Sequence, residues 1–166
     1  MLNRLTDIKD DVEHSDNSLR EEVHRGTNES VVRRWLARKL NERSRQRYTI
    51  PQEEEIDQKE RPDLRAENPH TAPVSIELKW ADNWTLDELL ERLENQLVGQ
   101  YLRAHDSRYG IYVLATDGRK GHWKCPDGNL NFSQVIERVV RRAEELKRTR
   151  PGIGDLRVVA IDFRVP

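Results

Sequence analysis

The chain has 166 residues, of which 35% are hydrophobic and 36% are charged, and its formal net charge is −1. This length suits one domain with a compact core and a heavily charged surface. The near-zero net charge excludes a protein that is basic throughout, and the single cysteine, Cys125, excludes an internal disulfide and argues against a cysteine-built zinc site. No apolar run reaches the roughly 18 residues that cross a bilayer, and there is no secretory signal, so we expect a soluble, cytoplasmic protein with no membrane partner.

The first part of the chain is polar, with a weak helical pattern at Leu5, Ile8 and Val12 that ends at a glycine. We therefore expect residues 1–26 to form an arm or linker, with some helical character. One folded domain is expected at residues 27–166. Such an arm would join the domain to other domains of a larger protein.

Within the domain, the spacing of apolar residues alternates between helical and strand periods. The expected elements are a helix at 29–45, strands at 48–50 (extendable to 54), 63–66 and 74–80, a helix at 86–103 that a capping box opens at Thr85, a strand at 110–115, a helix at 133–147 and a strand at 156–165. The order α-β-β-β-α-β-α-β predicts an α/β protein whose mixed sheet is flanked by helices.

The third predicted strand carries charged side chains on one face. Because alternate residues of a strand point to opposite faces, Glu77 and Lys79 share a face, about 7 Å apart at the backbone. Asp63, at the start of the preceding strand, reaches the same face if the two strands are neighbours. Carboxylate oxygens suit Mg²⁺, which polarises a phosphoryl oxygen and lowers the pKa of a bound water, while a lysine orients that water or stabilises charge in the transition state. Asp63 and Glu77 are therefore predicted metal ligands, and Lys79 their electrostatic or proton-handling partner.

Pro62-Asp63 and Glu77-Leu78-Lys79 resemble the motif of the PD-(D/E)XK nuclease superfamily. The α-β-β-β-α-β order expected between Glu29 and Ala115, about half of the chain, is similar to its restriction-endonuclease-like core. The acid-x-lysine string occurs four times in the chain, but only Glu77 stands in an apolar strand that follows another strand's carboxylate. The resemblance implies an endonuclease that hydrolyses DNA, less often RNA, with Mg²⁺ or alternatively Mn²⁺.

Four further side chains are candidates for the same site. Some branches of that family carry a glutamine and a tyrosine one helical turn apart on the helix after this strand. Here Gln96 is followed at that spacing by Gln100, and Tyr101 comes one position late. Gln96 is therefore a catalytic candidate and Gln100 a candidate nucleic-acid contact. Tyr101 is either a site residue or a core residue. Glu29, one turn before the apolar stripe of the first helix, is either a third metal ligand, as the resemblance implies, or an acid that stabilises a helix N-terminus.

Local basic stretches predict where phosphates bind even when the whole chain is nearly neutral. Between Arg33 and Arg47 there are seven lysines and arginines against one acid, and we expect Arg33, Arg34 and Arg38 to contact nucleic acid. The basic stretch at 138–150 is the alternative. Each stretch is equally compatible with a solvated helix face.

We therefore predict a Mg²⁺-dependent endonuclease that acts on DNA in preference to RNA. The resemblance further suggests the effector domain of a larger bacterial restriction or phage-defence protein, working as a homodimer if both strands are cut. Two alternatives stay open. One is a non-catalytic module with a nuclease-like fold that binds nucleic acid or a partner protein, and the other is a structural domain that oligomerises through its charged helices.

Overall fold

A four-stranded mixed sheet forms the centre of the computed structural model, which describes residues 1–14, 19–23, 27–51, 62–103 and 107–164. The strand order is β1-β2-β3-β6, in which β1 and β2 are antiparallel and the other neighbours are parallel. The strands are β1 (Leu64–Asn68), β2 (Thr71–Trp80), β3 (Tyr109–Thr116) and β6 (Asp155–Asp162). The predicted α/β class with a mixed sheet is confirmed.

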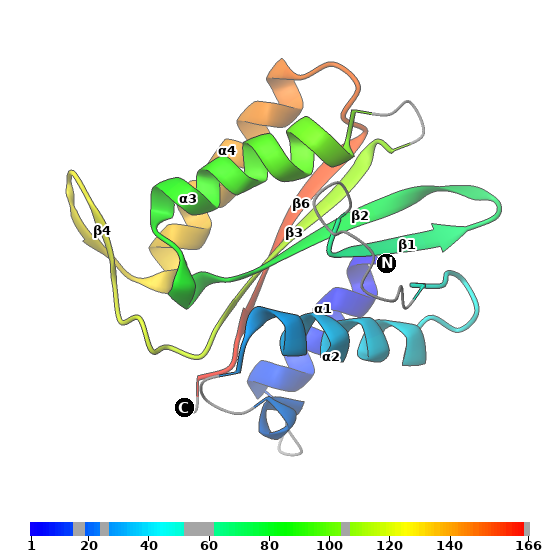
Figure 1. Cartoon of the computed structure of the whole chain (residues 1–166), viewed down its shortest axis with the longest axis horizontal. Helices are drawn as coiled ribbons and strands as arrows, with labels where there is room; N and C mark the ends of the chain where they lie inside the picture. Colours follow the sequence, from blue (N-terminus) through cyan, green and yellow to red (C-terminus); the bar gives the residue numbers. More distant parts are fainter. Residues whose placement is uncertain (15–18, 24–26, 52–61, 104–106, 165–166) are drawn as a thin grey trace.

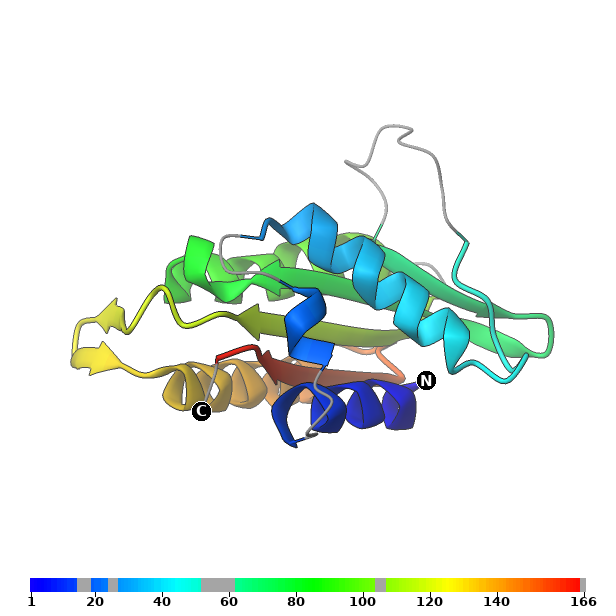
Figure 2. The ribbon, with the colours of Figure 1, turned by 90° about the horizontal axis from the view of Figure 1, so that it is seen from below.

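Helices cover both faces of this sheet (Figures 1 and 2). One face carries α1 (Leu2–His14) and α2 (Glu29–Glu42), and the other carries α3 (Leu86–Glu91), the π-helix η4 (Arg92–Tyr101) and α4 (Phe132–Thr149). The short helices η1 (Leu19–Glu22) and η3 (Ala81–Asn83) and a hairpin of β4 (Trp123–Cys125) and β5 (Gly128–Leu130) complete the described elements.

Each face of the sheet has its own hydrophobic core, because strand side chains alternate between the faces. Ile76 and Val113 belong to the core under α1 and α2, whereas Tyr112 and Leu114 belong to the core under α3, η4 and α4. The charged residues of β2 therefore point toward the second core, and the site lies where that core meets the edge of the sheet.

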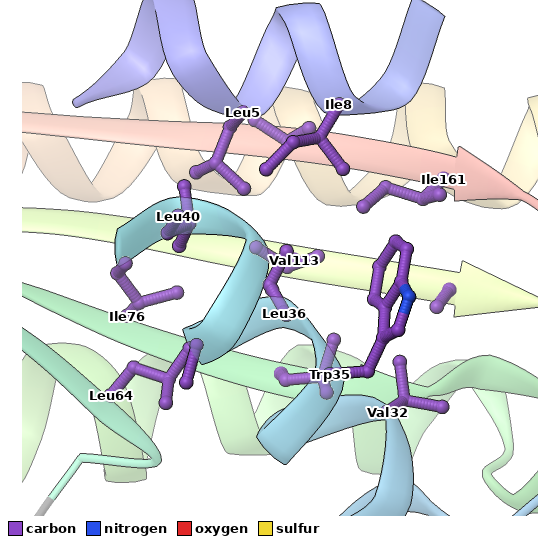
Figure 3. Packing of buried hydrophobic residues seen from close by; sticks show 14 of the residues in the cluster. Leu5, Ile8, Val32, Trp35, Leu36, Leu40, Leu64, Ile76, Val113 and Ile161 are labelled. Carbon is purple, nitrogen blue, oxygen red and sulfur yellow. The ribbon is translucent and has the colours of Figure 1, made fainter. Parts of the chain in front are cut away.

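The N-terminal stretch is part of the domain. Residues 1–26 were expected to form an arm or linker, but α1 buries Leu5, Ile8 and Val12 completely in the core that it shares with α2. Figure 3 shows Leu5 and Ile8 pointing from α1 toward the sheet, near Ile161 of β6. The apolar pattern of this segment is weak, but it is sufficient to bury one side of α1, because these three residues form one stripe on the helix. Residues 15–18 and 24–26 lie outside the described part of the chain.

The predicted strand at 48–50 is wrong. Thr49 makes only an isolated bridge to Glu67 of β1. The next residue cannot continue the ladder, because the Ile50 N–H donates to the side chain of Asn41 and the Ile50 carbonyl accepts from it, at 2.9 and 3.0 Å. Pro51 then has no N–H to donate. The suggested extension to residue 54 falls on 52–61, outside the described residues.

Candidate active site

Two carboxylates complete the open edge of β2. Because β1 begins only at Leu64, the described part of the chain places no strand beside the last residues of β2. Their outward N–H groups donate to side chains instead: Leu78 N–H donates to Asp63 Oδ2 at 2.9 Å, and Trp80 N–H donates to Glu29 Oε2 at 2.8 Å. The start of β1 and the N-terminus of α2 thus bring an aspartate and a glutamate to the same stretch of the sheet edge.

Glu77 and Lys79 meet these carboxylates on the buried face of β2. Glu77 is fully buried, and Lys79 is 4% exposed. The distances from Lys79 Nζ are 2.6 Å to Glu77 Oε1, 3.5 Å to Glu29 Oε1 and 3.8 Å to Asp63 Oδ2. One ammonium group therefore contacts three carboxylates that come from α2, the start of β1 and the middle of β2. The predicted proximity of Asp63, Glu77 and Lys79 is present in the structure, and Glu29 joins them.

The charges of this cluster do not cancel. Lys79 and Arg33, whose Nη1 lies 3.4 Å from Asp63 Oδ1, face three carboxylates. Burial raises the pKa of Glu77 to about 7, the charge of Asp63 adds to the rise, and Lys79 offsets part of it. Burial alone would lower the pKa of Lys79, but the charges of Glu77, Asp63 and Glu29 outweigh it and raise that pKa. Lys79 therefore stays protonated near neutral pH, and Glu77 releases its proton only near that pH.

The donor chemistry fits a hard divalent cation. Asp63 and Glu77 both direct an oxygen at the position of one ammonium group, so both face one point in space. Within the described ranges, no group of three or more His, Cys, Asp or Glu side chains is arranged to hold an ion. Mg²⁺, however, is commonly held by one or two carboxylates, with water and substrate phosphates as its other ligands. Glu29 also directs Oε1 at this ammonium group, while its Oε2 accepts from Trp80 N–H and from Trp84 Nε1.

The helix that follows β2 differs from the predicted one, and the difference changes which side chains meet beside the site. It is α-helical only to Glu91, and residues 92–101 form a π-helix, in which hydrogen bonds join residues five apart. Gln96 therefore meets Tyr101, to whose hydroxyl its Nε2 donates at 3.1 Å, and Gln100 is exposed on another side of the helix. A Gln96–Gln100 pair was expected, so the sequence interpretation assigned the wrong partner.

Tyr101 is the site residue that the sequence left undecided. It is 6% exposed, and burial raises its pKa; the hydrogen bond from Gln96 opposes that rise, while the charges of Glu77 and Asp63 add to it. The hydroxyl therefore lies within electrostatic reach of the carboxylates. The signal in the sequence was a tyrosine one residue late for an α-helical turn, which is the offset that π-helical winding corrects.

The arginines expected to contact nucleic acid fall into different environments. Arg33 belongs to the carboxylate cluster through Asp63. Arg34 is exposed, and Arg38 is exposed but pairs with Glu22 at 2.7 Å. Arg34 and Arg38 are one turn apart on α2, and the contact of the three arginines with nucleic acid stays a prediction.

A scan against family models and searches of the curated proteins and of the solved structures found no match. The helices in the described residues include none with both the length and the apolar character needed to span a bilayer. What the site does must therefore be inferred from its geometry and chemistry.

Proposed function

We propose that this chain is a Mg²⁺-dependent nuclease that hydrolyses phosphodiester bonds, in DNA in preference to RNA, on a restriction-endonuclease-like core. The observation that carries the proposal is the convergence of Asp63, Glu77 and Lys79 at the open edge of β2, with Glu77 fully buried. Burying charge destabilises a fold, so a buried group of carboxylates with an excess of negative charge calls for a reason beyond stability. Strongly perturbed pKa values of this kind concentrate at functional sites.

In this proposal, Asp63 and Glu77 hold the ion, which supplies polarisation of a phosphoryl oxygen and a lowered pKa for a water molecule. Lys79 is protonated and stabilises the negative charge that develops on the phosphate oxygens, so it is an electrostatic partner and not a general base. Tyr101 accepts a hydrogen bond from Gln96, which leaves its own hydroxyl proton for a phosphate oxygen. Gln96 and Tyr101 thus position the substrate.

The decisive variant is Glu77→Gln, which removes one carboxylate and retains its size. We expect Mg²⁺-dependent cleavage to fall by about 100-fold or more, the scale of losing one electrostatic contact to a transition state. Cleavage of plasmid, single-stranded DNA and RNA would be measured with Mg²⁺, Mn²⁺ or EDTA. Glu91→Gln, an exposed carboxylate on α3, is the matched control and should cleave like the wild type. Undiminished cutting by pure Glu77→Gln protein would refute the proposal.

The alternative is a non-catalytic module with the same fold, and one observation favours it. Asp63 and Glu29 already accept backbone N–H groups of β2, so the cluster also satisfies N–H groups that no strand in the described residues pairs with. If that is its whole role, Mg²⁺ should not bind through the carboxylates. Calorimetric titration of wild-type and Glu77→Gln protein with Mg²⁺ and Mn²⁺ distinguishes the two functions, since only a nuclease requires binding that the substitution abolishes.

A further inference from the structure

The two basic stretches of the sequence are largely neutralised in the folded chain. Several of their cations form ion pairs with carboxylates that are distant in the sequence or one helical turn away. These pairs join Arg38 and Lys39 to Glu22, Arg142 to Glu94 and Glu145, and Lys147 to Glu144 and Asp155. A phosphate at these helices would have to compete with carboxylates that are already in place.

A different group of cations lies near Trp84, the residue that precedes the N-cap of α3: two contact Trp84, and a third is on the β4–β5 hairpin, whose Trp123 contacts it. The Arg92 guanidinium lies over the Trp84 ring, 5.1 Å from its centroid. Lys120 Nζ donates to the Trp84 carbonyl at 2.6 Å, and Lys124 is exposed on β4. Within the described ranges, none of these three cations forms an ion pair. No carboxylate of the described chain therefore offsets their charges directly.

Trp84 connects this group to the candidate active site. Its Nε1 donates to Glu29 Oε2 at 3.3 Å, and Lys79 Nζ lies 5.8 Å from the centroid of its ring. Arg92 and Lys79 therefore both lie against one indole, an arrangement in which the ring stabilises nearby positive charge. Arg92 is consequently an exposed cation beside the buried Lys79.

The segment that carries the other two cations is fixed to the chain just after β2. Asp82 accepts hydrogen bonds from Lys120 N–H at 2.8 Å and from the Thr116 hydroxyl at 2.7 Å. The indole of Trp123 donates to the Trp84 carbonyl at 3.1 Å, beside the bond from Lys120. The β4–β5 hairpin projects from the end of the molecule where α3 begins (Figure 1). These hydrogen bonds thus fix the position of the segment from Lys120 to the hairpin relative to the site.

Two acidic side chains near these cations interact with other groups of the chain. Glu88 lies within electrostatic reach of Arg92 and Lys120, but its carboxylate accepts from the N–H and the hydroxyl of Thr85 in the capping box. Asp127, in the turn of the hairpin, pairs with Arg138 at 3.7 Å. Both carboxylates therefore have other partners, and neither forms an ion pair with Arg92, Lys120 or Lys124 among the described residues.

We propose that Arg92 and Lys120, which contact Trp84, and Lys124, on the adjoining β4–β5 hairpin, bind the phosphate backbone of a polynucleotide that leads into the carboxylate–lysine site. This inference rests on the proposed nuclease function, which makes the carboxylate–lysine site the point where the bound strand is cut. It adds a substrate class to that function. The substrate is a strand or duplex long enough to extend from the site to the β4–β5 hairpin, as opposed to a mononucleotide or dinucleotide. Phosphate contacts of this kind hold a substrate in place without reading its sequence.

The test is binding in EDTA, where cleavage does not interfere. The protein carrying Arg92→Gln and Lys124→Gln is compared with the wild type on a labelled long single strand, a duplex and a dinucleotide over a range of salt. The matched control is Arg141→Gln with Arg148→Gln, two exposed α4 cations that lack ion pairs among the described residues and carry the same loss of charge. Thermal unfolding checks that both double variants are folded.

We expect the Arg92/Lys124 variant to bind the long ligands about tenfold more weakly or worse at about 0.1 M salt, with a salt dependence shallower by about 1.5 in log–log slope, as two lost phosphate contacts require. The control should stay within about twofold. Equal losses in both variants, or no polynucleotide binding by the wild type, would overturn the inference. If the wild type cleaves nothing with Mg²⁺ but the binding difference holds, the nuclease proposal fails and the binding surface stands. If cleavage is present and the difference is absent, only the binding surface fails.

Discussion

Glu77 is the residue whose burial sets the charge state of the site. Its pKa in the folded protein is raised from 4.5 to about 7, so the folded state holds the proton that the unfolded state releases. The protonated form stabilises the fold fully below about pH 4.5, and this contribution is lost as the pH rises through about 7. In EDTA, the free energy of unfolding of the wild type should therefore fall by up to about 3 kcal/mol across this window relative to Glu77→Gln, which cannot ionise.

Urea unfolding of both proteins at a series of pH values measures this difference. Glu91→Gln provides the control for the chemical change itself, because Glu91 is an exposed carboxylate outside the cluster around Lys79. A constant offset between the wild type and Glu77→Gln from pH 5 to 8 would contradict the assignment of the proton to Glu77.

The π-helix η4 determines which side chain pairs with Gln96. Tyr101→Phe removes the hydroxyl that Gln96 contacts and leaves the ring in its buried position. We expect a loss of about 1 kcal/mol in stability and, because the hydroxyl is proposed to contact a phosphate oxygen, a fall in the cleavage rate of about tenfold or more. Gln100→Ala should leave the rate unchanged, since Gln100 is exposed and separate from the pair.

Tyr112→Phe is the control for the loss of a buried hydroxyl. The Tyr112 hydroxyl donates to the Leu89 carbonyl at 2.9 Å, inside the core under α3. Its removal should cost a similar free energy of unfolding but leave the cleavage rate of the folded protein unchanged. If both tyrosine variants cleave alike, Tyr101 is a packing residue only. Cleavage rates and unfolding would be measured on the same preparations.

The elements that the sequence predicted correctly are those with a local cause. Strand alternation placed Glu77 and Lys79 on one face, and the capping box at Thr85 fixed the start of α3. The π-helical winding had no such signal beyond the late tyrosine. The roles of Glu29 and Asp63 as hydrogen-bond acceptors for β2 could not be predicted either, because they depend on where β1 stops, which is a property of the assembled sheet.

In the whole molecule, the two faces of the sheet carry separate hydrophobic cores, and only one of these cores adjoins the site. α1 and α2 pack on the face opposite Glu77, and α2 also delivers Glu29 to the edge where the site lies. Trp84 and the cations near it follow the same C-terminal end of β2, and the β4–β5 hairpin is bonded to Trp84 through Trp123. Substitutions in the core under α1 should therefore change stability without changing the chemistry of the folded protein.

Ile8→Ala tests whether α1 is part of the domain. Ile8 is fully buried, so we expect the free energy of unfolding to fall by about 2–5 kcal/mol, the cost of the lost apolar contacts and of the cavity left behind. Asp10→Ala, at an exposed position of the same helix, should change it by no more than about 0.5 kcal/mol. Urea unfolding measures both. Since α1 lies away from Lys79 and its carboxylates, the cleavage rate of folded Ile8→Ala protein should equal that of the wild type. Equal stability of the two variants would mean that α1 does not contribute to the core and that residues 1–26 behave as a separate arm.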